Sequence, residues 1–104
     1  MPTVVGLTAT GTKLVLVRAS GPASDTTVGA GASATVALSY AASEASKILR
    51  ALGIAAVAGL PDGVVLEGFS ADESGVSLKV RNTTGSDVTL SANSLSATVL
   101  VEAL

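Results

Sequence analysis

The sequence predicts a mainly β fold, an antiparallel β-sandwich or barrel with one short helix. Short runs of β-prone residues recur along the chain, separated by clusters of Gly, Asn, Asp and Pro, which is typical of such folds. One run alternates between apolar and polar residues, and another segment has the three- and four-residue spacing of a helix. With 104 residues the chain has the usual size of one domain, so residues 1–104 are expected to form a single β-rich domain.

The first part of the chain is expected to supply strands joined by a turn and a loop. Residues 4–10 are β-prone but short, and a turn is expected at residues 11–12. Residues 13–18 place four apolar residues between two charges, a length and composition typical of a buried strand. Residues 21–32 are rich in Gly, Ser and Thr and are predicted to form a loop. Residues 34–40 are predicted to form the next strand.

Residues 43–52 are the segment that the sequence predicts to be helical. Ser43 can cap the N-terminus, and the negative charge of Glu44 in the first turn suits the helix dipole. Gly53 stands where a left-handed C-terminal cap is expected. Four apolar residues recur at spacings of three and four and would form one face of the helix. They are Ala45, Ile48, Leu49 and Leu52.

The second half of the chain has the clearest strand pattern. A strong turn signal, Leu-Pro-Asp-Gly, occupies residues 60–63. Residues 76–82 alternate cleanly, which predicts that Val76, Leu78 and Val80 face the core. The strands of this half are expected at residues 64–69, 76–82, 88–90 and 95–101.

Composition favours a protein that assembles with other proteins. Charged residues make up only 13% of the chain, about half the usual quarter, and the aromatic residues are one Tyr and one Phe. A surface with so few solubilising groups is stabilised when part of it is buried against partner subunits. The alternative is a monomer whose surface is coated with Ser and Thr.

The residues that are missing exclude several classes of function. The chain has no Cys and no His, which excludes disulfides, thiolate or imidazole metal sites and an imidazole base. No catalytic residue, cofactor or metal is therefore expected. The net charge is −2 and the six Lys and Arg are scattered, so nucleic-acid binding is not expected. Residues 51–66, the most apolar stretch, are too short and too interrupted to span a membrane, and the start does not resemble a signal peptide.

Two local motifs have competing interpretations. Asp72 and Glu73 are adjacent in a predicted turn, and their oxygens could bind calcium weakly. A solvated hairpin tip is favoured, because such residues are common in turns. Asn82 and Thr84 match the pattern of a glycosylation acceptor. We interpret that motif as a turn, with Asn82 ending the preceding strand.

An apolar segment with no charge nearby is the candidate interface. Residues 54–60 are apolar but not clearly periodic, and no charge lies between Arg50 and Asp62. The segment either covers the core of its own domain or docks on a partner. The residues of the hypothesised interface are Val4, Val5, Ile54, Val57 and Leu60.

Residues 60–101 resemble the ending of small tailed-phage virion proteins. The matching features are Leu60-Pro61-x-Gly63-Val64-Val65, then Val76-x-Leu78-x-Val80-Arg81-Asn82-x-Thr84-Gly85, and then a last Val-rich strand.

The resemblance implies a non-enzymatic virion structural protein of a bacteriophage, a capsid decoration or head-fibre subunit on the capsid surface. Its expected partners are the major capsid or other virion proteins and copies of itself. Three copies are expected, because capsids have local threefold positions. The alternative is a cytoplasmic β-sandwich interaction module of a bacterial cell, and a third class is a small enzyme that uses carboxylates.

Overall fold

A computed structural model describes residues 3–7 and 12–104, with only the backbone described for residues 3–7. The described residues are mainly β, in antiparallel strands, with one short helix, which confirms the predicted fold class. The elements are β1 (Thr3–Leu7), β2 (Lys13–Gly21), β3 (Thr26–Val28), β4 (Ser33–Tyr40), α1 (Ala42–Ala45), β5 (Ile48–Ala58), β6 (Val64–Ala71), β7 (Val76–Asn82), β8 (Val88–Leu90) and β9 (Leu95–Ala103).

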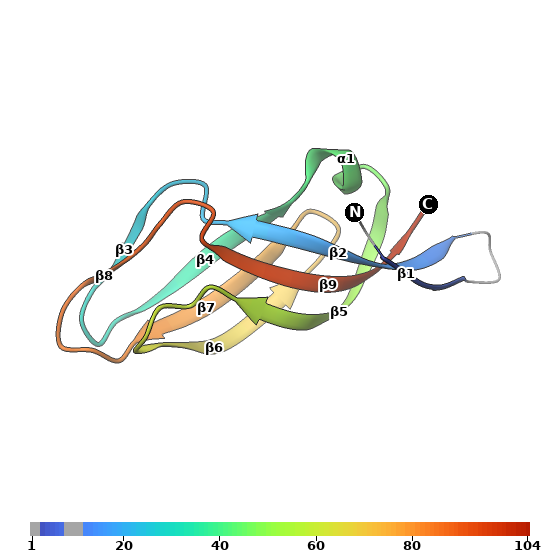
Figure 1. Cartoon of the computed structure of the whole chain (residues 1–104). Coiled ribbons are helices and arrows are strands. Elements are labelled where there is room, and N and C mark those ends of the chain that lie inside the picture. Colours follow the sequence, from blue (N-terminus) through green and yellow to red (C-terminus); the bar gives the residue numbers. More distant parts are fainter. Residues whose placement is uncertain (1–2, 8–11) are drawn as a thin grey trace.

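The larger sheet has the strand order β5-β9-β2-β4-β7-β6, and β1 also pairs with β2. This sheet curls into a nearly closed structure whose two end strands are β5 and β6. A second, two-stranded sheet of β3 and β8 extends from one end of the molecule, opposite the end where β1 lies (Figure 1). The molecule is therefore elongated, with extents of 51 × 21 × 17 Å.

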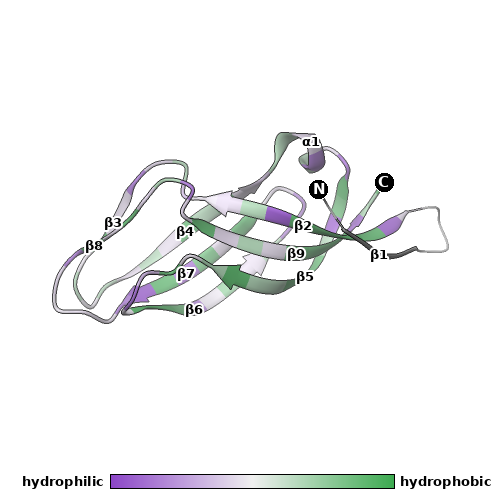
Figure 2. Cartoon of the chain, in the orientation of Figure 1, coloured by the Kyte–Doolittle hydropathy of each residue, from purple (hydrophilic) through white to green (hydrophobic). Residues whose placement is uncertain are grey.

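The core is built from small and medium apolar side chains on alternating positions. Along β7, Val76, Leu78 and Val80 are buried, as predicted, and the residues between them are exposed. β9 follows the same alternation against β2, whose ladder runs without a break from Lys13 opposite Ala103 to Gly21 opposite Leu95. Figure 2 shows the resulting bands of apolar and polar residues along these strands.

The prediction of a helix over residues 43–52 is wrong in its extent. The helix α1 comprises only four residues, and β5 begins at Ile48. Ser43 lies inside α1, the N-cap position is Ala41, which makes no side-chain capping bond, and Gly53 lies within β5. A helix of about three turns is marginal without tertiary packing, whereas a strand beside β9 gains backbone hydrogen bonds along its length.

Three bulges in β5 explain why its sequence resembles a helix. The ladder to β9 shifts register three times, so that three residues of β5 occupy the length of two residues of β9. Every third residue of β5 therefore faces the core, a spacing close to the helical period. The inward residues are Ile48, Ala51, Ile54 and Val57, and the extra residues are Leu49, Leu52 and Ala55.

The strand β3 lies within the segment predicted to be a loop. It has only three residues, and each pairs with a residue of β8 about sixty positions further along the chain. Thr27 and Thr89, which face each other in this ribbon, have hydroxyl oxygens 3.3 Å apart. Such a short strand forms because its partner is present, and local sequence carries little sign of it.

Candidate assembly surface

The candidate assembly surface is formed by the two end strands of the curled sheet. β5 pairs only with β9, and β6 pairs only with β7, among the residues that the structure describes. The turn of residues 59–63 joins them. Gly59 in this turn has a φ of +94°, and a Cβ there would collide with the carbonyl oxygen of Ser94, so the turn requires glycine. Among the described residues, the backbone groups on the outer edges of β5 and β6 consequently pair with no other strand.

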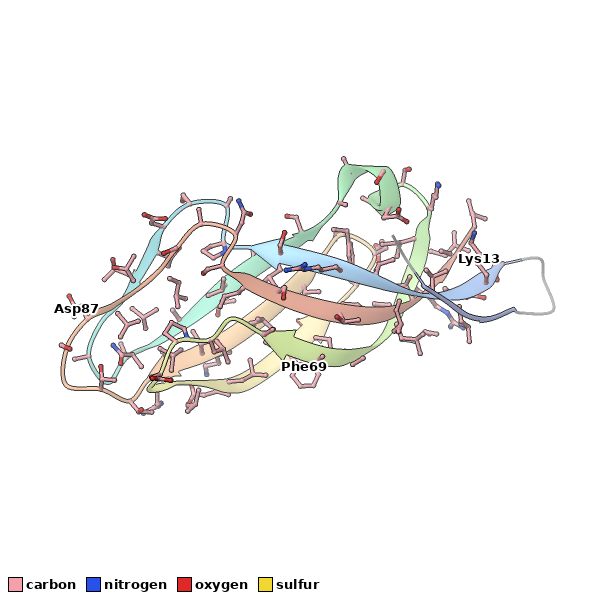
Figure 3. The ribbon with its side chains drawn as sticks, viewed as in Figure 1. Lys13, Phe69 and Asp87 are labelled. Atoms are coloured by element: carbon pink, nitrogen blue, oxygen red, sulfur yellow. The ribbon has the colours of Figure 1, made fainter. Side chains whose placement is uncertain are left out.

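Phe69 is an apolar side chain on the core-facing side of β6 that the fold leaves uncovered. It stands opposite Leu78 of β7, and directly opposite residues of an antiparallel pair share one face of the sheet. Leu78 is completely buried, but Phe69 is 59% exposed. β6 is the last strand of the sheet, so no further strand pairs beside Phe69. Figure 3 labels Phe69 in the region of β5 and β6.

Other apolar side chains are exposed on the same two strands. On β5, Leu49 and Leu52 are bulge residues with about half of their surface exposed. On β6, Val65 is 46% exposed and stands opposite Arg81, on the outer face of the sheet. We call Leu49, Leu52, Val65 and Phe69 the end-strand apolar residues. They gather on the two end strands of the larger sheet.

The residues of the hypothesised interface whose side chains are described are less exposed than the end-strand apolar residues. Ile54, Val57 and Leu60 are partly buried and pack against the core of their own chain, so each has only part of its side chain available to a partner. Val4 and Val5 belong to β1, and their side chains lie outside the described residues. Phe69 and Leu52 were not predicted as interface residues, because nothing in a local pattern shows which strand ends a sheet.

Asp72 is occupied in shaping a hairpin. Its Oδ1 accepts hydrogen bonds from the backbone N–H of Ser74 (2.8 Å), the Ser74 hydroxyl (2.7 Å) and the N–H of Gly75 (3.0 Å). These bonds, that from the Ser74 hydroxyl first, lower the pKa of Asp72. Within residues 3–7 and 12–104 no group of three or more Asp or Glu could hold a metal ion.

Tyr40 holds the same hairpin through a hydrogen bond to its backbone. Its side chain is buried and its hydroxyl donates a hydrogen bond to the carbonyl oxygen of Asp72 at 2.9 Å. Burial, together with the charges of Asp72 and Glu73, raises the pKa of Tyr40. A tyrosine held neutral in this way anchors the β6–β7 hairpin to the end of β4.

Asn82 is the buried polar centre of the other end of β7. Its Nδ2 donates to the carbonyl oxygens of Val28 (3.0 Å) and Ser86 (2.8 Å). Its Oδ1 accepts from the N–H of Thr84 at 2.9 Å, and the Thr84 hydroxyl lies 2.6 Å away. The side chain is completely buried and ends β7, as the turn interpretation of this motif expects. A glycan on this amide would replace one of the two N–H groups that make the bonds to Val28 and Ser86.

Glu67 ties three strands together on the outer face. It is the bulge residue of β6, and its carboxylate forms an ion pair with Arg81 of β7 at 2.9 Å. It also accepts a hydrogen bond from the Ser33 hydroxyl of β4 at 2.6 Å. The Ser33 bond, followed by the bond from Arg81, lowers the pKa of Glu67. The carboxylate is therefore engaged within its own sheet.

A polar hollow of about 620 Å³ lies where β2 meets β4. Arg18, Ser20, Ser39, Tyr40 and Asn93 line it together with two alanines. Its lining contains no carboxylate. A hydrolase that works with two carboxylates needs both of them across one cleft, and this hollow does not supply them.

Comparison of the chain with protein-family models, with curated proteins and with solved structures finds no match. Within residues 3–7 and 12–104 no helix is long and apolar enough to cross a membrane.

Proposed function

We propose that the chain is a non-enzymatic structural subunit of a virus particle that acts by binding other proteins. The observation that supports assembly is the exposure of Phe69 on the core-facing side of β6. An aromatic ring in that position is normally covered, and aromatic residues are enriched at the buried centres of protein interfaces. The virion assignment rests on the resemblance of residues 60–101, which comprise β6, β7, β8, β9 and the turns between them.

The partners proposed are a capsid or other virion protein and further copies of this chain. Complete burial of a Leu or Phe side chain contributes about 1.5–3 kcal/mol. The four end-strand apolar residues are about half exposed, so covering them would contribute on the order of 3–6 kcal/mol before the cost of association. That amount supports a weak contact, and many weak contacts together hold a subunit in a high-copy array.

The second candidate is a β-sandwich interaction module of a bacterial cell. The same exposed residues support it, because any protein partner would bury them. The two candidates differ in copy number: a shell subunit occurs in a symmetric array of many copies, whereas a module binds its target in small numbers.

An antibody raised against the purified chain tests the proposal. It is applied by immunogold electron microscopy to lysates of the cells that carry the sequence, after phage induction and banding of particles in a density gradient. Regular labelling of capsids, with tens of copies per particle by quantitative immunoblotting, is the expected result. Labelling restricted to cellular protein would refute the virion assignment and favour the module.

A further inference from the structure

We propose that β6 pairs with β6 of a second copy of this chain, so that the two sheets become continuous across a two-fold axis. This inference rests on the proposed function, because it assumes that the chain works by assembly. The contact between copies is then β6 against β6, and at this surface the copies are related by a two-fold axis in place of the expected threefold arrangement.

β6 has an edge able to accept another strand. Proteins protect such edges with bulges, charges or proline, because unpaired backbone groups otherwise recruit another strand. β5, the other end strand, has three bulges along its length. β6 has one, at Glu67, and beyond it residues 68–71 run regularly along β7 with no charge and no proline. Of the two end strands, β6 therefore has the unprotected stretch.

The same stretch of β6, residues 68–71, carries the exposed ring of Phe69. Phe69 is the chain's one phenylalanine, and it lies in the middle of residues 68–71. A neighbouring strand would add both backbone hydrogen bonds and a side chain opposite the ring, which is the usual mode of strand addition. The occupant is thus an extended strand with an apolar residue on the core-facing side.

β6 of a second copy is such a strand, and one register of pairing suits both copies. A two-fold axis at Phe69 places the two Phe69 rings opposite each other, Gly68 opposite Ser70 and Glu67 opposite Ala71 of the second copy. No charge then faces a like charge or a ring.

The neighbouring registers are worse. An axis at Gly68 places Phe69 opposite Glu67 of the second copy, and an axis at Ser70 places Glu67 opposite Glu73. A carboxylate beside a ring or beside another carboxylate is unfavourable. The charge pattern therefore selects the axis at Phe69, and a two-fold axis is the commonest symmetry of homo-oligomers.

The experiment has two arms. In the first, sedimentation equilibrium measures the dimer dissociation constant of the intact chain, of Phe69→Lys and of Val65→Lys. Val65 is the matched control, because it is an exposed apolar residue of the same strand on the outer face. Phe69→Lys is expected to weaken dimerisation at least about thirtyfold, as for a central aromatic anchor. Val65→Lys is expected to leave it within about threefold, as for a residue outside the contact.

The second arm tests the register by disulfide cross-linking, and the chain has no cysteine of its own that would interfere. Gly68→Cys and Ser70→Cys are prepared separately, and Gly68 has open space for a side chain. A mixture of the two variants is expected to form a disulfide-linked dimer on mild oxidation, and neither variant alone is expected to do so. Circular dichroism checks that each variant keeps the β fold of the parent.

The outcomes separate this inference from the proposed function. If the intact chain associates but Phe69→Lys and Val65→Lys behave alike, or if the mixture forms no cross-link, the β6 contact is refuted and assembly stands. If Gly68→Cys or Ser70→Cys cross-links alone, the register is refuted. If the intact chain stays monomeric at millimolar concentration and its antibody labels no particle, both proposals fail.

Discussion

Replacing Asn82 with Ala should destabilise the domain strongly while leaving its exposed surface unchanged. The amide is completely buried and bridges three segments of chain: the end of β3, the turn after β7 and β7 itself. Alanine removes both donors and the acceptor. The carbonyl oxygen of Val28 and the N–H of Thr84 then lose this partner, and the carbonyl oxygen of Ser86 keeps only the bond from the Thr84 hydroxyl.

The size of the effect follows from the surroundings of each bond. The bond to Val28 is buried, and a buried carbonyl left unpaired costs about 1–3 kcal/mol. The bonds to Ser86 and Thr84 are partly buried, so water replaces some of their energy, and each contributes roughly 0.5–1 kcal/mol. The sum is about 2–5 kcal/mol, a large part of the 5–15 kcal/mol that stabilises a typical domain. The melting temperature should fall by at least about 10 °C.

Urea unfolding followed by circular dichroism measures this change. The midpoint should fall while the slope of the transition stays constant, because the same surface is exposed on unfolding. Thr83→Ala is the matched control: its hydroxyl donates to the Gly63 carbonyl at 2.6 Å, but in an exposed position, so less than about 1 kcal/mol should be lost. A loss below about 1 kcal/mol for Asn82→Ala, or equal losses for both variants, would contradict the reasoning.

Three further predictions test other parts of the structure. Because folding lowers the pKa of Asp72, its carboxylate stabilises the domain at any pH above its unfolded pKa, near 4, and this stabilisation is lost as the pH falls through the folded pKa. Asp72→Ala should therefore flatten the acid limb of a plot of melting temperature against pH. Gly59→Ala should cost roughly 1–3 kcal/mol, and Gly53→Ala, where a side chain meets open space, should change stability by less than about 0.5 kcal/mol in chemical denaturation. Val57→Asp should lower the urea midpoint, because Val57 packs against the core, whereas Leu52→Asp should leave it nearly unchanged; equal effects would mean that the inward spacing of β5 is misassigned.

The sequence predicts those strands whose pattern is decided locally. β7 alternates strictly and has one face in the core, so period two alone locates Val76, Leu78 and Val80. The Leu-Pro-Asp-Gly turn likewise precedes β6 as predicted. Strand pairing between distant segments leaves no such mark, which is why β3 was missed.

The candidate surface was less predictable than the fold, because it depends on which strand ends the sheet. Phe69 stands opposite a fully buried Leu78, and its pattern is that of a core residue. The exposure of the ring becomes evident only in the folded structure, where β6 is at one end of the sheet. The position of Asn82 as a strand end could be read from the sequence, but its bond to Val28 joins a segment 54 positions away that only the fold brings near.

The bulges of β5 connect the failed helix prediction with the proposed contact between copies. Each bulge shifts the backbone by one residue, which gives β5 its inward spacing of three and makes its sequence resemble a helix. The same shifts interrupt the regular row of donors and acceptors on its outer edge, so β5 is a poor template for another strand. β6 lacks this protection beyond Glu67, and the chain's one phenylalanine stands there. An irregular strand and a regular one thus end the same sheet, and the difference between them determines which edge is available to a second copy.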